Sequence, residues 1–250
     1  ADAAQQHFRL AALKGISQAD PQGTVSILIK ELSRYDEQYQ REVLKVAVSS
    51  AGTPAALKQW QKVYKKSSGA AQADILSMLA AANRNDGFVE SMLVPALASS
   101  NQSTRLAAAS QIASYRNKKF TPSLVDYLLK STDESELAAA SAAILQVADK
   151  DTDALLAQKI EGAQSKNKVA LLQLLAARRA VSQFEVVARQ TSSGDAAVKE
   201  AAFKALPNVS SGNQVSGLLK MLAATEDDKA LKSIQSSIIS GLDKNSVTLI

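Results

Sequence analysis

The sequence predicts an all-α fold: a right-handed α-solenoid of stacked antiparallel helix pairs, with about 15 helices. Three observations predict this fold. Apolar residues recur with a period close to 32 residues, turn signals separate the apolar segments, and hydrophobic residues make up 46% of the chain while aromatic residues make up only 4%. A core of alanine and aliphatic side chains suits thin helices that pack mainly on their neighbours.

The strongest repeat signal is a series of eight apolar residues, which we call the marker positions. They are separated by 31 to 33 residues, and a second apolar residue precedes each marker by four residues, one helical turn away on the same face. The markers are Ile16, Val48, Leu79, Ile112, Ile144, Leu175, Leu206 and Ile238, and the residues four before them are Ala12, Leu44, Ile75, Ala108, Ala140, Leu171, Ala202 and Ile234. Each marker therefore ends an amphipathic helix, which we call second-type.

Helix-start signals lie eleven residues before the markers. Five of the eight residues there are Ser, Asn or Asp, whose side chains accept hydrogen bonds from the free N–H groups of a first helical turn. The series reads Gln5, Glu37, Ser68, Asn101, Asp133, Gln164, Asp195 and Asp227. We therefore expect the second-type helices to begin at these residues.

A second amphipathic segment precedes each marker from Val48 onward by about twenty residues, and we call these helices first-type. The segments contain Leu28, Gln59, Met92, Leu124, Leu155, Val186 and Leu218, with Trp60 in place of Gln59 at the core. Pro and Gly signals such as "ADPQG" (19–23), "AGTP" (52–55), "KFTP" (119–122) and "PNVSSGN" (207–213) predict helix ends between the segments. Pro95 lies inside a first-type segment, where its missing N–H predicts a bend.

The residues of two repeats resemble the HEAT repeat family, within the wider HEAT and armadillo group. "GDAAVKEAAFKAL" (194–206) is similar to the second helix of such a repeat through Asp195, Val198 with Lys199, Ala202 and Leu206. "NQSTRLAAASQI" (101–112) is similar to the same helix. The resemblance implies an α-solenoid that serves as an interaction scaffold. The repeats near 59–79 and 155–175 differ from the family pattern, because they lack the Asp and the Arg that the pattern has in its second helix.

The register predicts a single HEAT-like repeat domain over residues 1–250, in units of about 32 residues. Ile16 belongs to a second-type helix whose first-type partner would have to precede Ala1, and "SVTLI" (246–250) resembles the start of another first-type helix. We therefore expect the chain to be a piece of a longer protein. Its Ala-, Ser-, Gln- and Lys-rich style resembles HEAT segments of secreted multidomain proteins of Bacteroidetes, which implies a bacterial protein outside the cytoplasm.

The residue types in this sequence do not indicate a catalytic site, a cofactor site or a metal site. His7 is the only histidine and cysteine is absent, so thiolate sites and acid–base pairs that need histidine are excluded. No glycine-rich phosphate loop occurs. We expect no enzymatic activity, no cofactor, no bound metal and no membrane insertion, since no apolar run approaches the length of a membrane span.

The segment "LKQWQKVYKK" (57–66) interleaves lysines with Trp60 and Tyr64, a pattern that nucleic-acid and membrane-surface sites also use. At about 100° per residue the rings fall on one helix face and the lysines on the other. We interpret the segment as a solvated helix over a buried stripe. A basic series seven before the markers, Arg9, Arg41, Arg105, Lys168 and Lys199, is interrupted by Gln72, Leu137 and Leu231. Its spacing from Glu37, Asn101 and Asp195 favours pairing within helices over a ligand-binding ladder.

We expect a non-catalytic protein–protein interaction scaffold, an accessory segment of a larger multidomain protein, with a protein or peptide partner. The alternative is a nucleic-acid-binding HEAT-like solenoid of the alkylbase-glycosylase kind, which the net charge of +5 permits. Candidate partner-binding residues lie six before the markers, opposite the buried arc: Leu10, Leu106 and Val169 are large and apolar there. The alternative interpretation is that neighbouring helices partly cover these three side chains.

Overall fold

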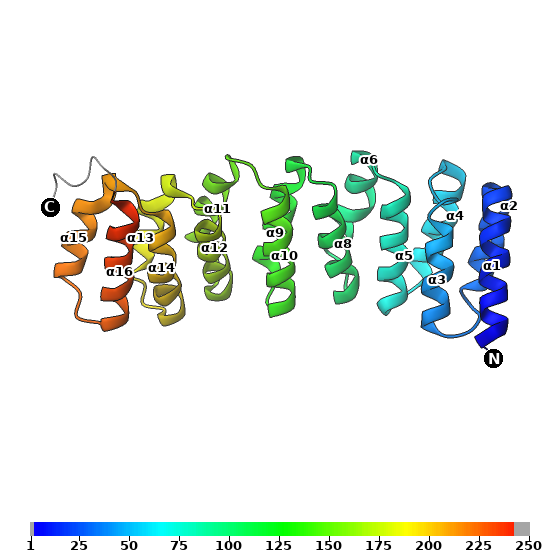
Figure 1. The fold of residues 1–250 in the computed structure, drawn as a ribbon, viewed down its shortest axis with the longest axis horizontal. Helices are drawn as coiled ribbons and strands as arrows, with labels where there is room; N and C mark the ends of the chain where they lie inside the picture. Colours follow the sequence, from blue (N-terminus) through cyan, green and yellow to red (C-terminus); the bar gives the residue numbers. More distant parts are fainter. Residues whose placement is uncertain (1–2, 243–250) are drawn as a thin grey trace. The chain divides into compact units, whose positions relative to one another are not determined.

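The structure, a computed structural model, describes residues 3–242, and every long regular element in this range is a helix. Residues 3–242 form fifteen helices when one irregular helix is counted once, which confirms the all-α solenoid prediction (Figure 1). The chain folds as two compact units, Ala1–Asn117 and Lys118–Ile250. A single domain over residues 1–250 stays a prediction, and the segment 246–250 lies outside the described residues.

The first unit contains four second-type helices and three first-type helices. The second-type helices are α1 (Ala3–Ala19), α3 (Glu37–Ala47), α5 (Gly69–Ala82) and α8 (Gln102–Ser114). The first-type helices are α2 (Pro21–Glu31), α4 (Pro54–Lys66) and an irregular helix made of α6 (Asp86–Phe88), the π-helical turn η1 (Val89–Leu93) and α7 (Val94–Ala96).

The described part of the second unit contains four helices of each type, and short 3-10 turns lead into three of its first-type helices. Its second-type helices are α10 (Glu134–Val147), α12 (Ser165–Ala177), α14 (Ala196–Val209) and α16 (Asp228–Gly241). Its first-type helices are α9 (Thr121–Lys130), α11 (Thr152–Ile160), α13 (Phe184–Gln190) and α15 (Val215–Ala223). The 3-10 turns η2 (Lys118–Phe120), η3 (Val181–Gln183) and η4 (Gly212–Gln214) precede α9, α13 and α15.

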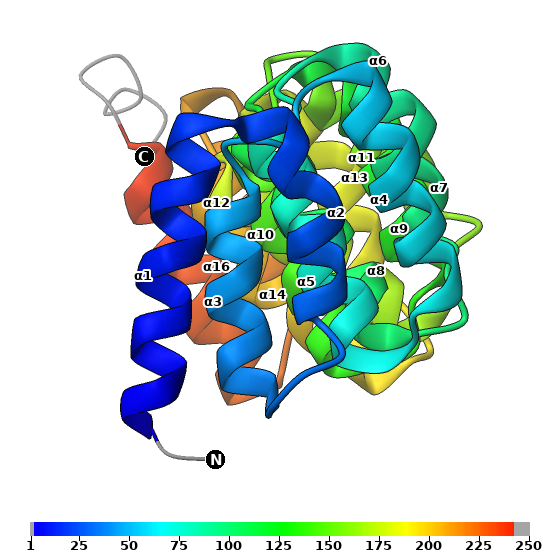
Figure 2. The same cartoon turned by 90° about the vertical axis from the view of Figure 1, so that its right-hand side faces the viewer.

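Each second-type helix from α3 onward packs against the first-type helix that precedes it in the chain. Consecutive second-type helices also pack on each other within each unit, as α5 does on α8 and α12 does on α14. Figure 2 shows α1, α2 and α3 side by side and running in alternating directions. Each unit is therefore a stack of antiparallel helix pairs.

Small side chains fill the contact between helices. Ala108, Ala140 and Ala202, all four residues before a marker, are 0% exposed. Large aromatic side chains are few, but Trp60 is also 0% exposed, while the four lysines of α4 are exposed. This confirms that Trp60 of "LKQWQKVYKK" faces the core, while Tyr64 is half-buried. It also confirms that Trp60 takes the core place beside Gln59.

Helix α1 departs from the predicted register. We expected Ala12 and Ile16 to be buried, but Ala12 is exposed and Ile16 is 46% exposed. Leu13 and Ser17 are buried instead. The reason is that α1 packs on α2 and α3, which follow it, so α1 buries the helix face adjacent to the predicted one.

The predicted helix starts are confirmed at all five Ser, Asn and Asp positions. Ser68, Asn101, Asp133, Asp195 and Asp227 are N-cap residues, and all but Ser68 accept backbone N–H bonds through their side chains. Helix α3 begins at Glu37, as predicted, but its N-cap is the residue before it. Asp36 is the N-cap of α3, because its carboxylate accepts the N–H of Tyr39 at 2.9 Å. Gln5 lies inside α1.

Proline acts differently at different places in the helices. Pro21, Pro54 and Pro122 lie in the first turns of α2, α4 and α9, where a missing N–H costs nothing. The helix end predicted at "PNVSSGN" (207–213) is confirmed, since α14 ends at Val209, but Pro207 itself lies inside the last turn of the helix. Val209 is 0% exposed, and the Ser210 hydroxyl donates to the carbonyl of Leu206 at 2.7 Å, so burial and this bond hold the last turn.

The predicted irregularity at Pro95 takes the form of a π-helical turn just before the proline. Pro95 cannot donate to the carbonyl of Ser91, and its ring needs the space near that carbonyl. The wider turn over Val89–Leu93 relieves the clash. The Ser91 hydroxyl donates to the carbonyl of Gly87 at 2.6 Å, which satisfies part of the disturbed backbone.

The buried alanine contacts lead to a stability prediction. Replacing Ala202 with Asp places a carboxylate between α14 and its neighbours at a position with 0% exposure. We expect A202D to lower the free energy of unfolding by about 3 kcal/mol or more, because no partner is present for a buried charge. Urea denaturation measures this. The matched control is A142D on the exposed face of α10, for which we expect a loss below about 1 kcal/mol. Equal losses in the two variants would contradict the assigned register.

Candidate functional site

Grooves run between consecutive second-type helices. They lie between α3 and α5, α10 and α12, and α14 and α16, with volumes of about 320, 460 and 260 Å³. Equivalent residues line all three: the positions seven and three before the marker on the first helix, and five before the marker on the next. These residues are Arg41, Lys45 and Asp74; Leu137, Ser141 and Ala170; and Lys199, Phe203 and Ser233. The repeat therefore builds the same groove with different chemistry each time.

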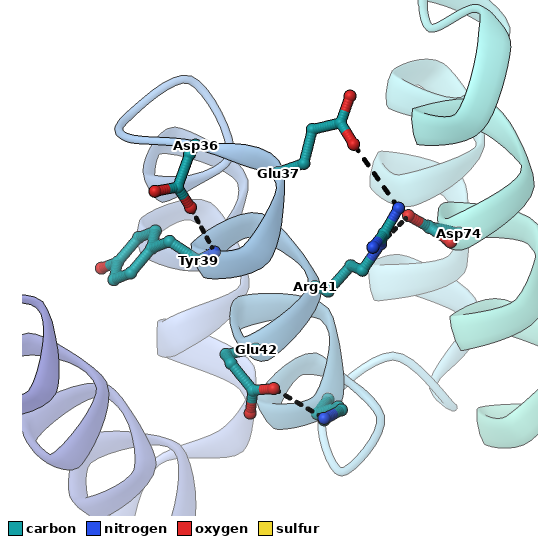
Figure 3. Close-up of polar contacts among 7 residues, drawn as sticks. Asp36, Glu37, Tyr39, Arg41, Glu42 and Asp74 are labelled. Atoms are coloured by element: carbon teal, nitrogen blue, oxygen red, sulfur yellow. Dashed lines mark hydrogen bonds and ion pairs between the residues drawn. The ribbon is translucent and has the colours of Figure 1, made fainter.

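The α3–α5 groove is spanned by an ion pair. The Arg41 guanidinium donates to Asp74 at 3.0 Å and lies 3.5 Å from Glu37, while Lys45 contacts Glu42 at 2.6 Å (Figure 3). The hydrogen bond to Asp74 raises the pKa of Arg41 further above its ordinary value. The predicted pairing of Glu37 with Arg41 is confirmed, but the shorter contact crosses to the next repeat. This groove is occupied by its own charged side chains.

The α14–α16 groove combines one ring with several charges. Phe203 is half-buried, and Lys199, Lys204 and Lys229 lie around it. Lys204 contacts Glu200 at 2.7 Å. The hydrogen bond and charge of Lys204 lower the pKa of the Glu200 carboxyl.

The α10–α12 groove has an apolar floor and the largest volume of the three, about 460 Å³. Leu137, Ala138, Val169 and Ala170 supply its apolar lining. Hydroxyl and amide groups of Ser141, Ser165 and Gln173 and the charged Glu134 and Lys166 complete it. An apolar floor with a few polar groups at the edge is the usual composition of a peptide- or ligand-binding groove.

The predicted partner-binding residues have different surroundings. Val169 is half-buried and lines the α10–α12 groove. Leu10 on α1 and Leu106 on α8 are also half-buried. Leu10 and Leu106 belong to the first compact unit and Val169 to the second, and their binding role stays a prediction for each.

Sequence reasoning missed Leu137 as a groove residue. It treated Leu137 as a break in the basic series seven before the markers. The leucine in the basic series could have indicated an apolar groove, because the position seven before the marker lines a groove in each of three repeats. A leucine at this otherwise basic position replaces a charged groove with an apolar one.

A buried carboxylate joins the first three helices. Glu31, with a side chain 7% exposed, accepts from Arg9 at 3.2 Å, Arg34 at 3.0 Å and the Tyr39 hydroxyl at 2.9 Å. Burial by itself raises the pKa of Glu31, but the hydrogen bonds of Arg9 and Tyr39 and the two guanidinium charges outweigh burial and lower it. Burial and the bond to Glu31 raise the pKa of Tyr39 to about 12.

Few side chains among the described residues are of the types that form metal or acid–base sites. No group of three or more His, Cys, Asp or Glu side chains there is placed to hold a metal ion. His7 is exposed on α1. No helix among residues 3–242 has the length and apolar character needed to cross a bilayer.

The stacked helix pairs and the grooves between second-type helices define a HEAT- or armadillo-like helical-repeat protein. No protein-family model matches the chain, and no curated protein matches its sequence. The likenesses to three solved structures have TM-scores below 0.5, so the fold assignment rests on the helix pairs of this chain.

Three solved structures illustrate these likenesses. An engineered protein has 20% identity and a TM-score of 0.44, covering 96% of this chain and 73% of its own. The complex of CpcE and CpcF of phycocyanin lyase from Nostoc sp. PCC7120 has 13% identity and a TM-score of 0.41, covering 85% and 93%. A designed armadillo repeat protein has 18% identity and a TM-score of 0.35, covering 85% and 98%.

The Glu31 cluster predicts a pH-dependent contribution to stability. Because the folded-state pKa of Glu31 is lowered, its contribution is present above the unfolded-state pKa, near 4.3, and is lost as pH falls through the folded-state value. We expect E31Q to lower the free energy of unfolding at pH 7 by about 1–3 kcal/mol, since it leaves buried donors without their charged acceptor. The difference from wild type should shrink toward pH 3. Denaturant titrations at both pH values measure it.

The matched control for this prediction is E37Q, because the Glu37 side chain is 78% exposed. We expect E37Q to change the free energy of unfolding by less than about 0.5 kcal/mol at either pH. A difference between wild type and E31Q that is the same at pH 7 and pH 3 would show that the charge of Glu31 does not stabilise the fold.

Proposed function

We propose that this chain is a non-catalytic protein–protein interaction scaffold and that it binds a peptide segment of a partner in the α10–α12 groove. The observation that carries the proposal is the apolar floor of Leu137, Ala138, Val169 and Ala170 in a groove of about 460 Å³. A volume of this order accommodates a few side chains of a bound segment.

The groove chemistry suits an extended or helical peptide with apolar anchors. Ala138 and Ala170 are small, so a partner side chain can approach the helix backbones between them. Val169 is half-buried, so a bound side chain can cover its remaining exposed surface. Ser141, Ser165 and Gln173 offer hydrogen-bonding groups to the backbone of the bound segment.

The other two grooves support the choice of this one. Arg41 and Asp74 already pair across the α3–α5 groove, so a ligand there would have to displace an ion pair. Charged side chains surround Phe203 in the α14–α16 groove, and desolvating them would oppose binding. The α10–α12 groove has the least charge to desolvate.

The groove predicts a loss of peptide binding without loss of folding. Peptides selected from a displayed library on the wild-type chain should bind A138K/V169K at least tenfold more weakly, because two ammonium groups would occupy the apolar floor. Titration with labelled peptides measures affinity, and thermal denaturation measures folding. We expect the stability change to stay within about 1 kcal/mol, since a half-buried Lys stem can extend its ammonium group to water.

The matched control adds the same two charges elsewhere in the unit. A154K/Q158K places lysines on the exposed face of α11, four residues apart, and should retain peptide affinity. Selected peptides that bind A138K/V169K as tightly as wild type would refute the groove as the binding site. Unfolding of A138K/V169K would show that these side chains belong to the core.

The nucleic-acid alternative makes a different prediction. Trp60 is fully buried in α4, so it cannot stack on a base, and Lys58, Lys62, Lys65 and Lys66 form a solvated face. We expect the chain to bind duplex DNA no more tightly than about 1 μM at physiological salt. Fluorescence anisotropy over a salt series measures this. Submicromolar binding that weakens steeply with salt, and that K62Q/K66Q reduces, would favour the alternative.

A further inference from the structure

The first compact unit contains a cavity of about 630 Å³ where two neighbouring helix pairs meet. This volume is larger than that of any of the three grooves and falls in the range of ligand-binding pockets. The end of α2, the start of α3, the end of α4 and the start of α5 surround the cavity. All of its lining residues fall between Ile29 and Ile75, so the cavity lies inside the stack of helices and away from both ends of the chain.

One register position of the repeat is covered elsewhere and open at this cavity. In α8, α10, α12, α14 and α16 the residue eight before the marker is at most 4% exposed. These residues are Thr104, Glu136, Asn167, Val198 and Ala230. In α5 the same position is Ala71, which is exposed and lines the cavity.

Asn167 in α12 shows what kind of group fits this position. Its amide donates to the carbonyls of Leu128 and Ser131 at 2.6 and 2.9 Å, where the first-type helix of the preceding repeat ends. In α5 the preceding first-type helix is α2, and Leu32 at its end lines the cavity. Ala71 has no donor to offer to that helix end. The cavity therefore leaves room for a ligand that brings its own N–H groups.

Aliphatic side chains give the cavity an apolar lining. Leu44 and Ile75 are buried, while Leu32 and Val63 are half-buried. A ligand with a hydrocarbon body would cover the exposed parts of Leu32 and Val63 and remove apolar surface from water.

The charged groups of the lining select for a cation. Glu37 and Asp74 line the cavity, and none of the described residues that line it is Lys, Arg or His. Arg41, outside the lining, contacts Oδ2 of Asp74 at 3.0 Å and Oε2 of Glu37 at 3.5 Å (Figure 3). Oδ1 and Oε1 remain for a further donor, since a carboxylate accepts several hydrogen bonds. The first turn of α5 adds a partial positive charge of about half a unit, which is less than the charge of either carboxylate.

We propose that this cavity binds a small primary amine with an aliphatic body. Its ammonium group donates to Glu37 and Asp74, and its hydrocarbon body lies against Leu32 and Val63. A primary ammonium group has three donors and stays charged at pH 7, so two donors serve the carboxylates and one remains for the end of α2. The site lies in the first unit and does not depend on the proposed function of the α10–α12 groove in the second.

The test uses the whole 250-residue chain and three ligands of similar shape: cyclohexylmethylamine, cyclohexylmethanol and cyclohexanecarboxylate. Titrations followed by ¹H–¹⁵N NMR measure the affinity and locate the site. We expect the amine to bind about tenfold more tightly than the alcohol or the carboxylate, because only the amine forms charge-assisted hydrogen bonds with the lining. The amide signals of Leu32, Val63 and Ala71 should shift.

Two variants of the lining and two controls separate this site from others. A71N places in the cavity the amide that α12 carries at the same register position, and we expect it to weaken amine binding about tenfold. The matched control A81N lies on the same helix outside the cavity and should retain wild-type affinity. D74N keeps the shape of the lining but removes one negative charge, so it should also weaken amine binding. A138K/V169K should retain it, whether or not peptides bind the α10–α12 groove.

Thermal denaturation checks the fold of each variant. A71N should be at least as stable as A81N, because both carry the same cost of Asn in a helix and Ala71 is exposed. If A71N perturbs α5, D74N decides the result. Absence of binding by all three ligands would overturn the proposal. Binding of the alcohol or the carboxylate as tight as that of the amine would do so too, as would amine binding that both A71N and D74N leave unchanged.

Discussion

The close packing of alanine-lined helices is the constraint on which the rest of the structure depends. Ala108, Ala140 and Ala202 are completely buried at equivalent positions, and a larger side chain at any of them would push two helices apart. In four other repeats the equivalent position is a buried Leu or Ile, so the core is a thin layer that continues from one helix pair to the next within a unit. Aromatic residues make up only 4% of the chain since few places in such a layer accommodate a ring. Trp60 is the exception, and α4 buries it completely.

Polar contacts repeat with the same period as the core. Ser17 and Ser49 share a hydrogen bond, Arg41 contacts Asp74, and Thr104 donates to Gln72, across sequence separations of 32, 33 and 32 residues. Buried Asn167 donates to the carbonyls of Leu128 and Ser131 at 2.6 and 2.9 Å, where α9 ends. Helix ends are the places where a helix leaves backbone groups unpaired, so these side chains satisfy groups that burial would otherwise penalise. The polar contacts therefore fix the register that apolar packing alone would leave free to slide.

The grooves follow from the same arrangement. Consecutive second-type helices pack on each other, and the residues seven, five and three before the markers line the grooves between them in three places. The side chain seven before the marker decides the chemistry of each groove, as the contrast between Arg41 and Leu137 shows.

The sequence by itself determined the helical class, the period, the helix pairs and the capping residues, because these depend on local patterns. The spacing of Ala202 and Leu206 and the carboxylate of Asp195 specify a helix face and a helix start whatever surrounds them. Tertiary structure alone decided which face each helix buries and which position lines a groove. Ile16 matches the core pattern yet is exposed, Pro207 resembles a helix end yet lies inside α14, and Leu137 interrupts a basic series yet lines the apolar groove. In each case the deciding factor is a neighbouring helix distant in sequence, or the absence of one among the described residues, which a pattern within one helix does not encode.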